Sequence, residues 1–338
     1  MGQGRVLVTG ATGFVAGQCI AELLARGYDV RGTVRDPATA EVAHLRPLAE
    51  RDGRSLEFAQ ARLDADEGWA EAADGCDYVL HVASPIPFKA PKDENEIIRP
   101  AVDGTLRVLN AAAKAGVRRV VCTGSTDAIA HNSRTAGRVR TEDDWSDPAE
   151  CGAYAKSKIM AERAAREFAD DHSLELAMVL PGAVIGPPMR VERASSADIV
   201  RRMLAREMPL IPRLSLAFTD VRDLAVAHRL AMETPCAAGN RYICAGKDKW
   251  LHDVAKVLAA EYGPRGHRIS TRRLPSWVLR AAGPFSSEAK LAISVLGIPH
   301  VVSADKARRE LGWAPRPFRE SVLDTAESLI GRGLIVQR

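Results

Sequence analysis

Tyr154 and Lys158 lie four residues apart in the segment Tyr154-Ala155-Lys156-Ser157-Lys158. On a helix, which rises about 1.5 Å per residue, this spacing places two side chains on the same face. A lysine ammonium beside a phenol, whose free pKa is about 10, favours the phenolate. The pair could therefore exchange a proton with a substrate near neutral pH. The same spacing also arises by chance on amphipathic helices, so its meaning depends on the elements that position it.

The N-terminal segment has the pattern of a phosphate-binding turn. A short apolar run at Arg5–Thr9 is followed by Gly10-Ala11-Thr12-Gly13, and apolar residues then recur at helical spacing between 19 and 24. Gly10 permits a tight turn, and Gly13 lets the backbone approach a pyrophosphate at the helix N-terminus. A strand, a glycine turn and a helix in this order predict a dinucleotide-binding unit.

The end of the next predicted strand, Tyr28–Val34, bears on the choice between NAD and NADP. An NAD site usually has a carboxylate here that accepts a hydrogen bond from the ribose 2′-hydroxyl. This chain has Val34 followed by Arg35, whose guanidinium can pair with a 2′-phosphate. Alternatively, Arg35 is a solvated surface charge, and Asp36 would serve NAD after a small backbone shift. The sequence favours NADP(H) over NAD(H).

Further apolar segments are typical of a parallel sheet covered by helices on both faces. Strands are predicted at 56–63, 77–83, 117–123 and 174–180, and helices at 69–73 and 95–115. The fifth strand, at 117–123, delivers Ser125 at its carboxyl end, where ligands bind in open α/β sheets. Ser125 is therefore placed to hold a substrate carbonyl oxygen while Tyr154 gives that oxygen a proton.

The chain after the sixth strand is predicted to alternate between the main sheet and a smaller lobe. We expect a dinucleotide-binding Rossmann domain at 1–181 with a return segment at about 216–250, and a substrate-binding lobe formed by 182–215 and 251–338. Helices covering the pocket are expected at 251–262, 277–282, 287–296 and 318–330. The fold class is therefore α/β, a Rossmann-type doubly wound parallel sheet with a smaller, interwoven C-terminal lobe.

Composition narrows the functional classes. The 338 residues carry a net charge of +4, from 47 basic and 43 acidic residues in intermixed order, which argues against nucleic-acid binding. Six scattered cysteines without Cys-x-x-Cys spacing indicate reduced thiols rather than disulfides or zinc ligands. No apolar run approaches 18 residues. We expect a cytoplasmic monomer or homodimer that binds a small-molecule carbonyl substrate, with no membrane partner and no metal.

The residues above resemble the extended short-chain dehydrogenase/reductase family, and within it the branch of dihydroflavonol reductases, cinnamoyl-CoA reductases and aldehyde reductases. The matching motifs are the Thr9–Ala16 turn, Ser125, Tyr154 with Lys158, Val34-Arg35-Asp36-Pro37, Gly75-Cys76-Asp77-Tyr78-Val79, His81-Val82-Ala83-Ser84-Pro85, Asp103-Gly104-Thr105, Phe218 to Ala225 and Ala307 to Trp313. These motifs span about residues 5 to 330, which is nearly the whole chain.

The resemblance implies a role for each matching position. Tyr154 would be the general acid in reduction, Lys158 would lower its pKa and bind the nicotinamide ribose, and Ser125 would orient the carbonyl. The positions implied to contact the cofactor are Thr9, Gly10, Thr12, Gly13, Phe14, Val15, Arg35, Arg62, Leu63, Val82, Ala83, Ser84, Tyr154, Lys158, Pro181, Val184 and Ser196.

Three positions depart from the family pattern. The family usually has an aspartate for adenine where this chain has Arg62, and a second basic residue for the 2′-phosphate, expected near Val42, is absent. Dihydroflavonol reductases carry an asparagine five residues after the catalytic serine, where this chain has Ala130. A dihydroflavonol substrate is therefore disfavoured.

Taken together, the sequence predicts NADPH-dependent reduction of a ketone or aldehyde to an alcohol. One alternative is an NAD-dependent epimerase or hydroxysteroid-type dehydrogenase on the same scaffold, against which the missing carboxylate at Val34 argues. Another is a non-catalytic dinucleotide sensor, which would be expected to lose the pair of Tyr154 and Lys158.

Overall fold

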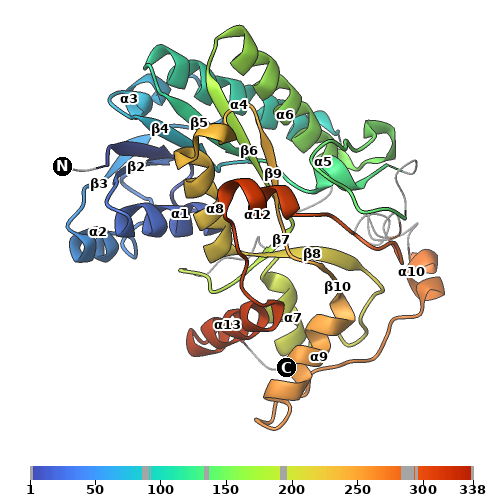
Figure 1. The fold of residues 1–338 in the computed structure, drawn as a ribbon. Helices are drawn as coiled ribbons and strands as arrows, with labels where there is room; N and C mark the ends of the chain where they lie inside the picture. Colours follow the sequence, from blue (N-terminus) through green and yellow to red (C-terminus); the bar gives the residue numbers. More distant parts are fainter. Residues whose placement is uncertain are drawn as a thin grey trace.

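The computed structural model describes residues 3–85, 91, 93–132, 137–190, 196–282, 293 and 296–335. A seven-stranded sheet with the order β3-β2-β1-β4-β5-β6-β9 forms its centre (Figure 1). The strands are β1 (Arg5–Val8), β2 (Asp29–Val34), β3 (Leu56–Gln60), β4 (Tyr78–His81), β5 (Arg119–Thr123), β6 (Glu175–Pro181) and β9 (Arg241–Cys244). Every pairing in this sheet is parallel. The predicted doubly wound parallel sheet is confirmed.

Helices cover both faces of this sheet because its strands are apolar on both sides. Val6 and Val8 of β1 belong to one core and Leu7 to the other. The first core is completed by α1 (Phe14–Ala25), α2 (Arg46–Asp52), α8 (Val221–Glu233) and α12 (Asp305–Leu311). The second is completed by α3 (Trp69–Ala73), α4 (Asn95–Lys114), α5 (Asp127–Ala130) and α6 (Ala153–Asp171). Such two-sided burial is characteristic of parallel sheets.

A smaller lobe is built around a second, three-stranded sheet with the order β10-β8-β7. Its strands are β7 (Ala183–Ile185), β8 (Ser215–Asp220) and β10 (Asp248–Trp250). The helices of this part of the chain are α7 (Asp198–Leu204), α9 (Leu251–Tyr262), α10 (Ser276–Ala282) and α13 (Phe318–Gly331), and short 3-10 turns elsewhere lie at Pro148–Glu150 and Pro235–Ala237. Figure 1 shows this lobe below the main sheet, with segments from distant parts of the chain side by side.

The predicted elements agree with the observed ones, apart from several boundaries and the lobe to which three elements belong. The strand expected to reach residue 63 ends at Gln60, because the backbone then turns and the Trp69 indole N–H donates to the Arg62 carbonyl at 3.0 Å. Within 216–250, α8 and β9 return to the main sheet as expected, but β8 and β10 belong to the small sheet. Conversely, α12 was expected in the substrate-binding lobe at 251–338, but it packs on the main sheet against α8 and β9, because Ala307 and Leu311 are buried there. The helix expected at 287–296 lies almost wholly outside the described residues.

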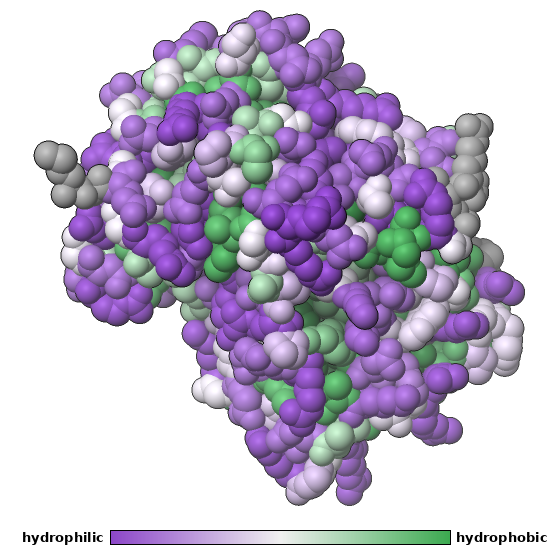
Figure 2. Space-filling model, viewed as in Figure 1, coloured by the Kyte–Doolittle hydropathy of each residue, from purple (hydrophilic) through white to green (hydrophobic). Residues whose placement is uncertain are grey.

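The surface is mainly polar on the side shown in Figure 2, where hydrophobic residues form small separate groups. Among the described residues, no helix combines the length and the hydropathy needed to cross a bilayer. The described residues also contain no group of three His, Cys, Asp or Glu side chains arranged to hold a metal ion.

Candidate active site

The glycine turn between β1 and α1 has the geometry that a phosphate-binding site requires. Gly10 has a φ of 71°, in the left-handed region that disfavours other residues, and a Cβ added there would lie 3.0 Å from the Ala83 Cβ. Gly13 precedes α1, and its N–H donates to the Gly10 carbonyl at 2.8 Å. The backbone therefore passes close to the end of β4 and presents the N-terminus of α1 to a ligand. These residues fit a dinucleotide pyrophosphate.

Thr9 joins this turn to the chain that follows β4. Its hydroxyl oxygen accepts the backbone N–H groups of Val82 and Ala83, both at 3.0 Å. The next residue, Ser84, accepts a hydrogen bond from the Lys158 ammonium at 3.0 Å. Three positions expected to contact the cofactor are therefore held beside the glycine turn, and one of them also contacts the candidate catalytic lysine.

His81 is a buried member of this network that our sequence analysis assigned no role. Its Nδ1 lies 3.0 Å from the Thr9 hydroxyl, and its Nε2 lies 3.2 Å from the Thr105 hydroxyl. Because Thr105 donates to the Ala101 carbonyl at 2.7 Å, it accepts from His81, so the proton belongs on Nε2. Burial, together with the charge of Lys158, lowers the pKa of His81 to about 3. A histidine inside an otherwise apolar strand was the signal available in the sequence.

Arg35 directly follows β2 and its side chain is exposed. Asp36 is engaged elsewhere: its carboxylate accepts the Ala38 N–H and the Thr39 hydroxyl, both at 2.9 Å. Using Asp36 for an NAD ribose would break this turn. The local structure therefore favours a guanidinium over a carboxylate at this position.

The other expected cofactor positions are more spread out. The Arg62 guanidinium pairs with Asp64 at 2.8 Å, and Leu63 packs beneath Gly104 of α4. At the end of β6, the Pro181 carbonyl accepts the Thr126 N–H at 2.9 Å, which places it beside Ser125. Val184 lies on β7, and Ser196 precedes α7 in the smaller lobe.

The three candidate catalytic residues come from two elements. Ser125 follows β5 and is 7% exposed, and its hydroxyl oxygen accepts the Asp127 N–H at 3.1 Å. Tyr154 lies in the first turn of α6, one turn before Lys158. The Lys158 Nζ lies 5.8 Å from the centre of the Tyr154 ring. Hydrogen bonding with Ser125 influences the titration of the Tyr154 hydroxyl, so the structure brings serine and tyrosine together.

The titration of Tyr154 differs from the expectation drawn from the sequence. Burial raises the pKa of its phenol, the Asp127 carboxylate raises it further, and hydrogen bonding with Ser125 opposes the rise. Burial also lowers the pKa of Lys158 to about 8, although the carboxylates of Asp127 and Glu162 favour its charged form. The pKa of Tyr154 is therefore raised in this arrangement, with desolvation as the largest cause, whereas the sequence led us to expect a lowered value.

A second polar group lies beside Ser125 and begins with Asp127, a residue that the sequence did not single out. Its carboxylate lies 3.2 Å from the His131 Nε2, and the His300 Nε2 lies 3.2 Å from the Thr126 hydroxyl. Burial disfavours ionisation of Asp127, but hydrogen bonding and the charge of His131 outweigh it, so the pKa of Asp127 is lowered. His300 reaches this group from 174 residues along the chain, a distance at which no sequence spacing carries a signal.

A buried ion pair supports α6 behind the lysine. Glu162, which is 1% exposed, follows Lys158 by one turn and pairs with Arg241 of β9. The Arg241 guanidinium also donates to the carbonyl of Asp144 at 2.9 Å and lies 3.9 Å from the centre of the Trp145 ring. The helix that carries Tyr154 and Lys158 is therefore tied to β9 and to the loop at 142–145.

The parallel sheet has a glycine turn after β1 and a serine after β5, and α6 carries a tyrosine and a lysine beside that serine. This arrangement defines a dinucleotide-binding α/β protein of the Rossmann type. The model of the NAD dependent epimerase/dehydratase family matches residues 6–245. The chain belongs to this family, as the resemblance to extended short-chain dehydrogenases/reductases predicted.

Its curated relatives include reductases. The chain is 38% identical over 333 residues to cinnamoyl-CoA reductase 1 of Arabidopsis thaliana, covering 97% of this chain and 90% of that protein. It is 35% identical to dihydroflavonol 4-reductase of Zea mays over 273 residues, covering 77% and 75% of the two chains.

A solved structure is similar over the whole chain. The yeast methylglyoxal/isovaleraldehyde reductase in complex with NADPH superposes with a TM-score of 0.78 at 26% identity, covering 98% of this chain and 100% of that one. Its NADPH agrees with the expectation of NADP(H) that Arg35 raised.

Proposed function

We propose that the protein is an NADPH-dependent reductase that converts a ketone or aldehyde into an alcohol, with Tyr154 as the proton donor. The observation that carries the proposal is the meeting of Ser125, Tyr154 and Lys158 beside the glycine turn, linked through Ser84. When bound, NADPH supplies the hydride for the carbonyl carbon. The reductases among the relatives and the yeast NADPH complex support the proposal.

The side chains divide the remaining chemistry between them. Ser125 holds the carbonyl oxygen and orients it toward the Tyr154 hydroxyl. Because the pKa of Tyr154 is raised, its phenol is protonated at neutral pH and is ready to give a proton to the oxygen as negative charge develops there. Lys158 supplies a positive charge next to this oxygen and a hydrogen-bond donor for the ribose of the cofactor.

An NADPH-oxidation screen tests the proposed reaction. The panel contains aliphatic aldehydes, aryl ketones, β-keto esters and hydroxyflavanones, each assayed with NADPH and with NADH. We expect turnover with NADPH on at least one class, with an alcohol product that mass spectrometry identifies. Interconversion of a sugar nucleotide at a tightly bound NAD, without net oxidation, would instead establish the epimerase alternative.

Replacing Arg35 by glutamine tests the assignment of the cofactor phosphate. An arginine paired with a phosphate contributes a charge-assisted hydrogen bond, so we expect kcat/KM for NADPH to fall by about tenfold or more while the value for NADH is retained. Arg51→Gln is the matched control, because Arg51 is an exposed arginine of α2 paired with Asp52. An equal decrease in kcat/KM for NADPH and NADH would show that Arg35 does not bind the 2′-phosphate.

A further inference from the structure

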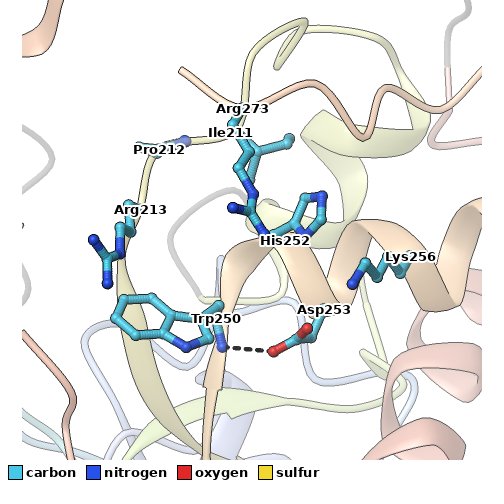
Figure 3. A pocket seen from close by; sticks show the side chains of 8 residues that line it. All are labelled: Ile211, Pro212, Arg213, Trp250, His252, Asp253, Lys256 and Arg273. Carbon is cyan, nitrogen blue, oxygen red and sulfur yellow. Dashed lines mark hydrogen bonds between the residues drawn. The ribbon is translucent and has the colours of Figure 1, made fainter. Parts of the chain in front are cut away.

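A pocket lies in the smaller lobe, and none of the residues proposed for catalysis line it. Its volume is about 360 Å³, within the range typical of sites for small organic ligands. Figure 3 shows its side chains coming from three segments: residues 211–213 before β8, the junction of β10 with α9, and Arg273. None of these residues has a part in the proposed reduction.

Three of the eight residues that line the pocket are cations. Arg213, Lys256 and Arg273 are exposed at its edge, and among the described residues none of the three is paired with a carboxylate. Elsewhere in the described chain, exposed arginines such as Arg51, Arg62 and Arg265 are paired with aspartate or glutamate. Three unneutralised charges around one cavity repel each other, and an anion between them would relieve that repulsion.

The remaining polar groups of the pocket are already engaged in ways that leave its charge positive. The Asp253 carboxylate accepts the Trp250 backbone N–H at 3.1 Å, which caps the start of α9 (Figure 3). The His252 Nε2 lies 3.0 Å from the Thr271 carbonyl oxygen, which can only accept a hydrogen bond, so this nitrogen is the donor. Asp253 is thus the one acidic side chain among the lining residues, and no carboxylate of the described part of the chain pairs with the three cations.

The pocket also offers apolar surface. The Arg213 guanidinium lies 5.2 Å from the centre of the Trp250 ring, and Ile211 forms part of the wall. A cation resting on an indole orients its donors without losing contact with solvent. The volume exceeds what a bare phosphate needs, so the ligand that fits has an oxyanion and an apolar part.

We propose that this pocket binds an anionic organic ligand, a phosphate or carboxylate carried on an apolar group. A line of contacts connects the pocket to the catalytic serine. Trp250 pairs with Ser215 across the small sheet, Ser215 accepts the His300 N–H at 3.3 Å, and the His300 ring contacts Thr126 beside Ser125. The oxyanion therefore belongs either to the far end of a substrate or to a separate ligand of the same chemistry.

Calorimetric titration of the protein tests the pocket with three probes: phenyl phosphate, inorganic phosphate and phenol. Saturating NADPH is present throughout, so that the dinucleotide site takes none of them. We expect phenyl phosphate to bind most tightly and its affinity to fall as salt is added. The variants R213Q, K256Q and R273Q should each weaken it about tenfold, because each removes one charge-assisted contact. Lys114→Gln, an exposed lysine at the end of α4, should leave it unchanged.

Binding needs no turnover, so this result stands apart from the outcome of the NADPH-oxidation screen. Phenyl phosphate is then added as a competitor in the reduction assay. If it raises KM for a carboxylate-bearing substrate but not for a neutral one, the pocket binds the oxyanion of the substrate. If phenyl phosphate changes kcat equally for both substrates, the pocket binds a separate anionic ligand. Equal affinity for phenol and phenyl phosphate, or affinity that survives in R213Q, K256Q and R273Q alike, overturns the proposal.

Discussion

A Tyr154→Phe variant is expected to lower kcat for carbonyl reduction by at least about a hundredfold, because a positioned general acid typically contributes 10²–10⁴-fold. Its affinity for NADPH should be largely retained, since the phenyl ring preserves the packing in the first turn of α6. The measurements are initial rates of NADPH oxidation and the NADPH dissociation constant from fluorescence quenching.

The structure gives this prediction a specific physical basis. The phenol of Tyr154 has a raised pKa and interacts with Ser125, so it holds a proton at neutral pH beside the site where the carbonyl oxygen is expected. Removing the hydroxyl leaves a negative oxygen with no proton donor at that position.

The control for this variant is Tyr28→Phe. Like Tyr154, Tyr28 has a hydrogen-bonded hydroxyl, which donates to Glu233 at 3.0 Å. Unlike Tyr154, it packs in the core formed with α1 and α8. Turnover should survive this change. If Tyr154→Phe retained its turnover, or lost NADPH binding in parallel with turnover, Tyr154 would not be the proton donor.

The second large effect is expected from Lys158 and appears as a pH dependence. Burial lowers the pKa of Lys158 to about 8, so the ammonium predominates below this pH and is lost above it. We expect kcat/KM for NADPH to be constant at lower pH and to decline above pH 8. Well above pH 8 the decline should be about tenfold for each pH unit. Tyr154 titrates at higher pH because its own pKa is raised, so it does not account for this decline.

Lys158→Met should lower kcat/KM by about a hundredfold and remove the decline at high pH, since no charge remains to titrate. Lys156→Met is a matched control on the same helix, because Lys156 pairs with Glu94 at 2.7 Å rather than with the active site. A wild-type profile that stays level to pH 10, or the same decline in Lys158→Met, would assign the titration to another group.

Much of the fold could be predicted because its signals are local. The run Val6-Leu7-Val8 is apolar at every position, which indicates a strand buried on both faces, and the two cores divide these residues as expected. The glycine turn was readable for the same reason, since Gly10 adopts a conformation that few other residues tolerate. The assignment of β8 to the small sheet was missed because an apolar segment does not specify which neighbour it pairs with.

Of the candidate site, only the three principal residues could be predicted from the sequence. Ser125, Tyr154 and Lys158 were found from their spacing and from the order of the elements that carry them. Their surroundings were not: the contact between Ser84 and Lys158 spans 74 residues, and Arg241 reaches Glu162 from 79 residues away. Such contacts depend on how the strands are ordered in space.

The sequence by itself determined the type of fold and the glycine turn, and it singled out the side chains that we propose to react, because strand alternation, helical spacing and the needs of a tight turn act over a few residues. The tertiary structure decided the electrostatic state of those side chains. It placed Asp127 where it raises the pKa of Tyr154, and it enclosed Lys158 so that its pKa falls to about 8. Desolvation and Coulomb interactions depend on distance through space, which spacing along the chain does not reveal.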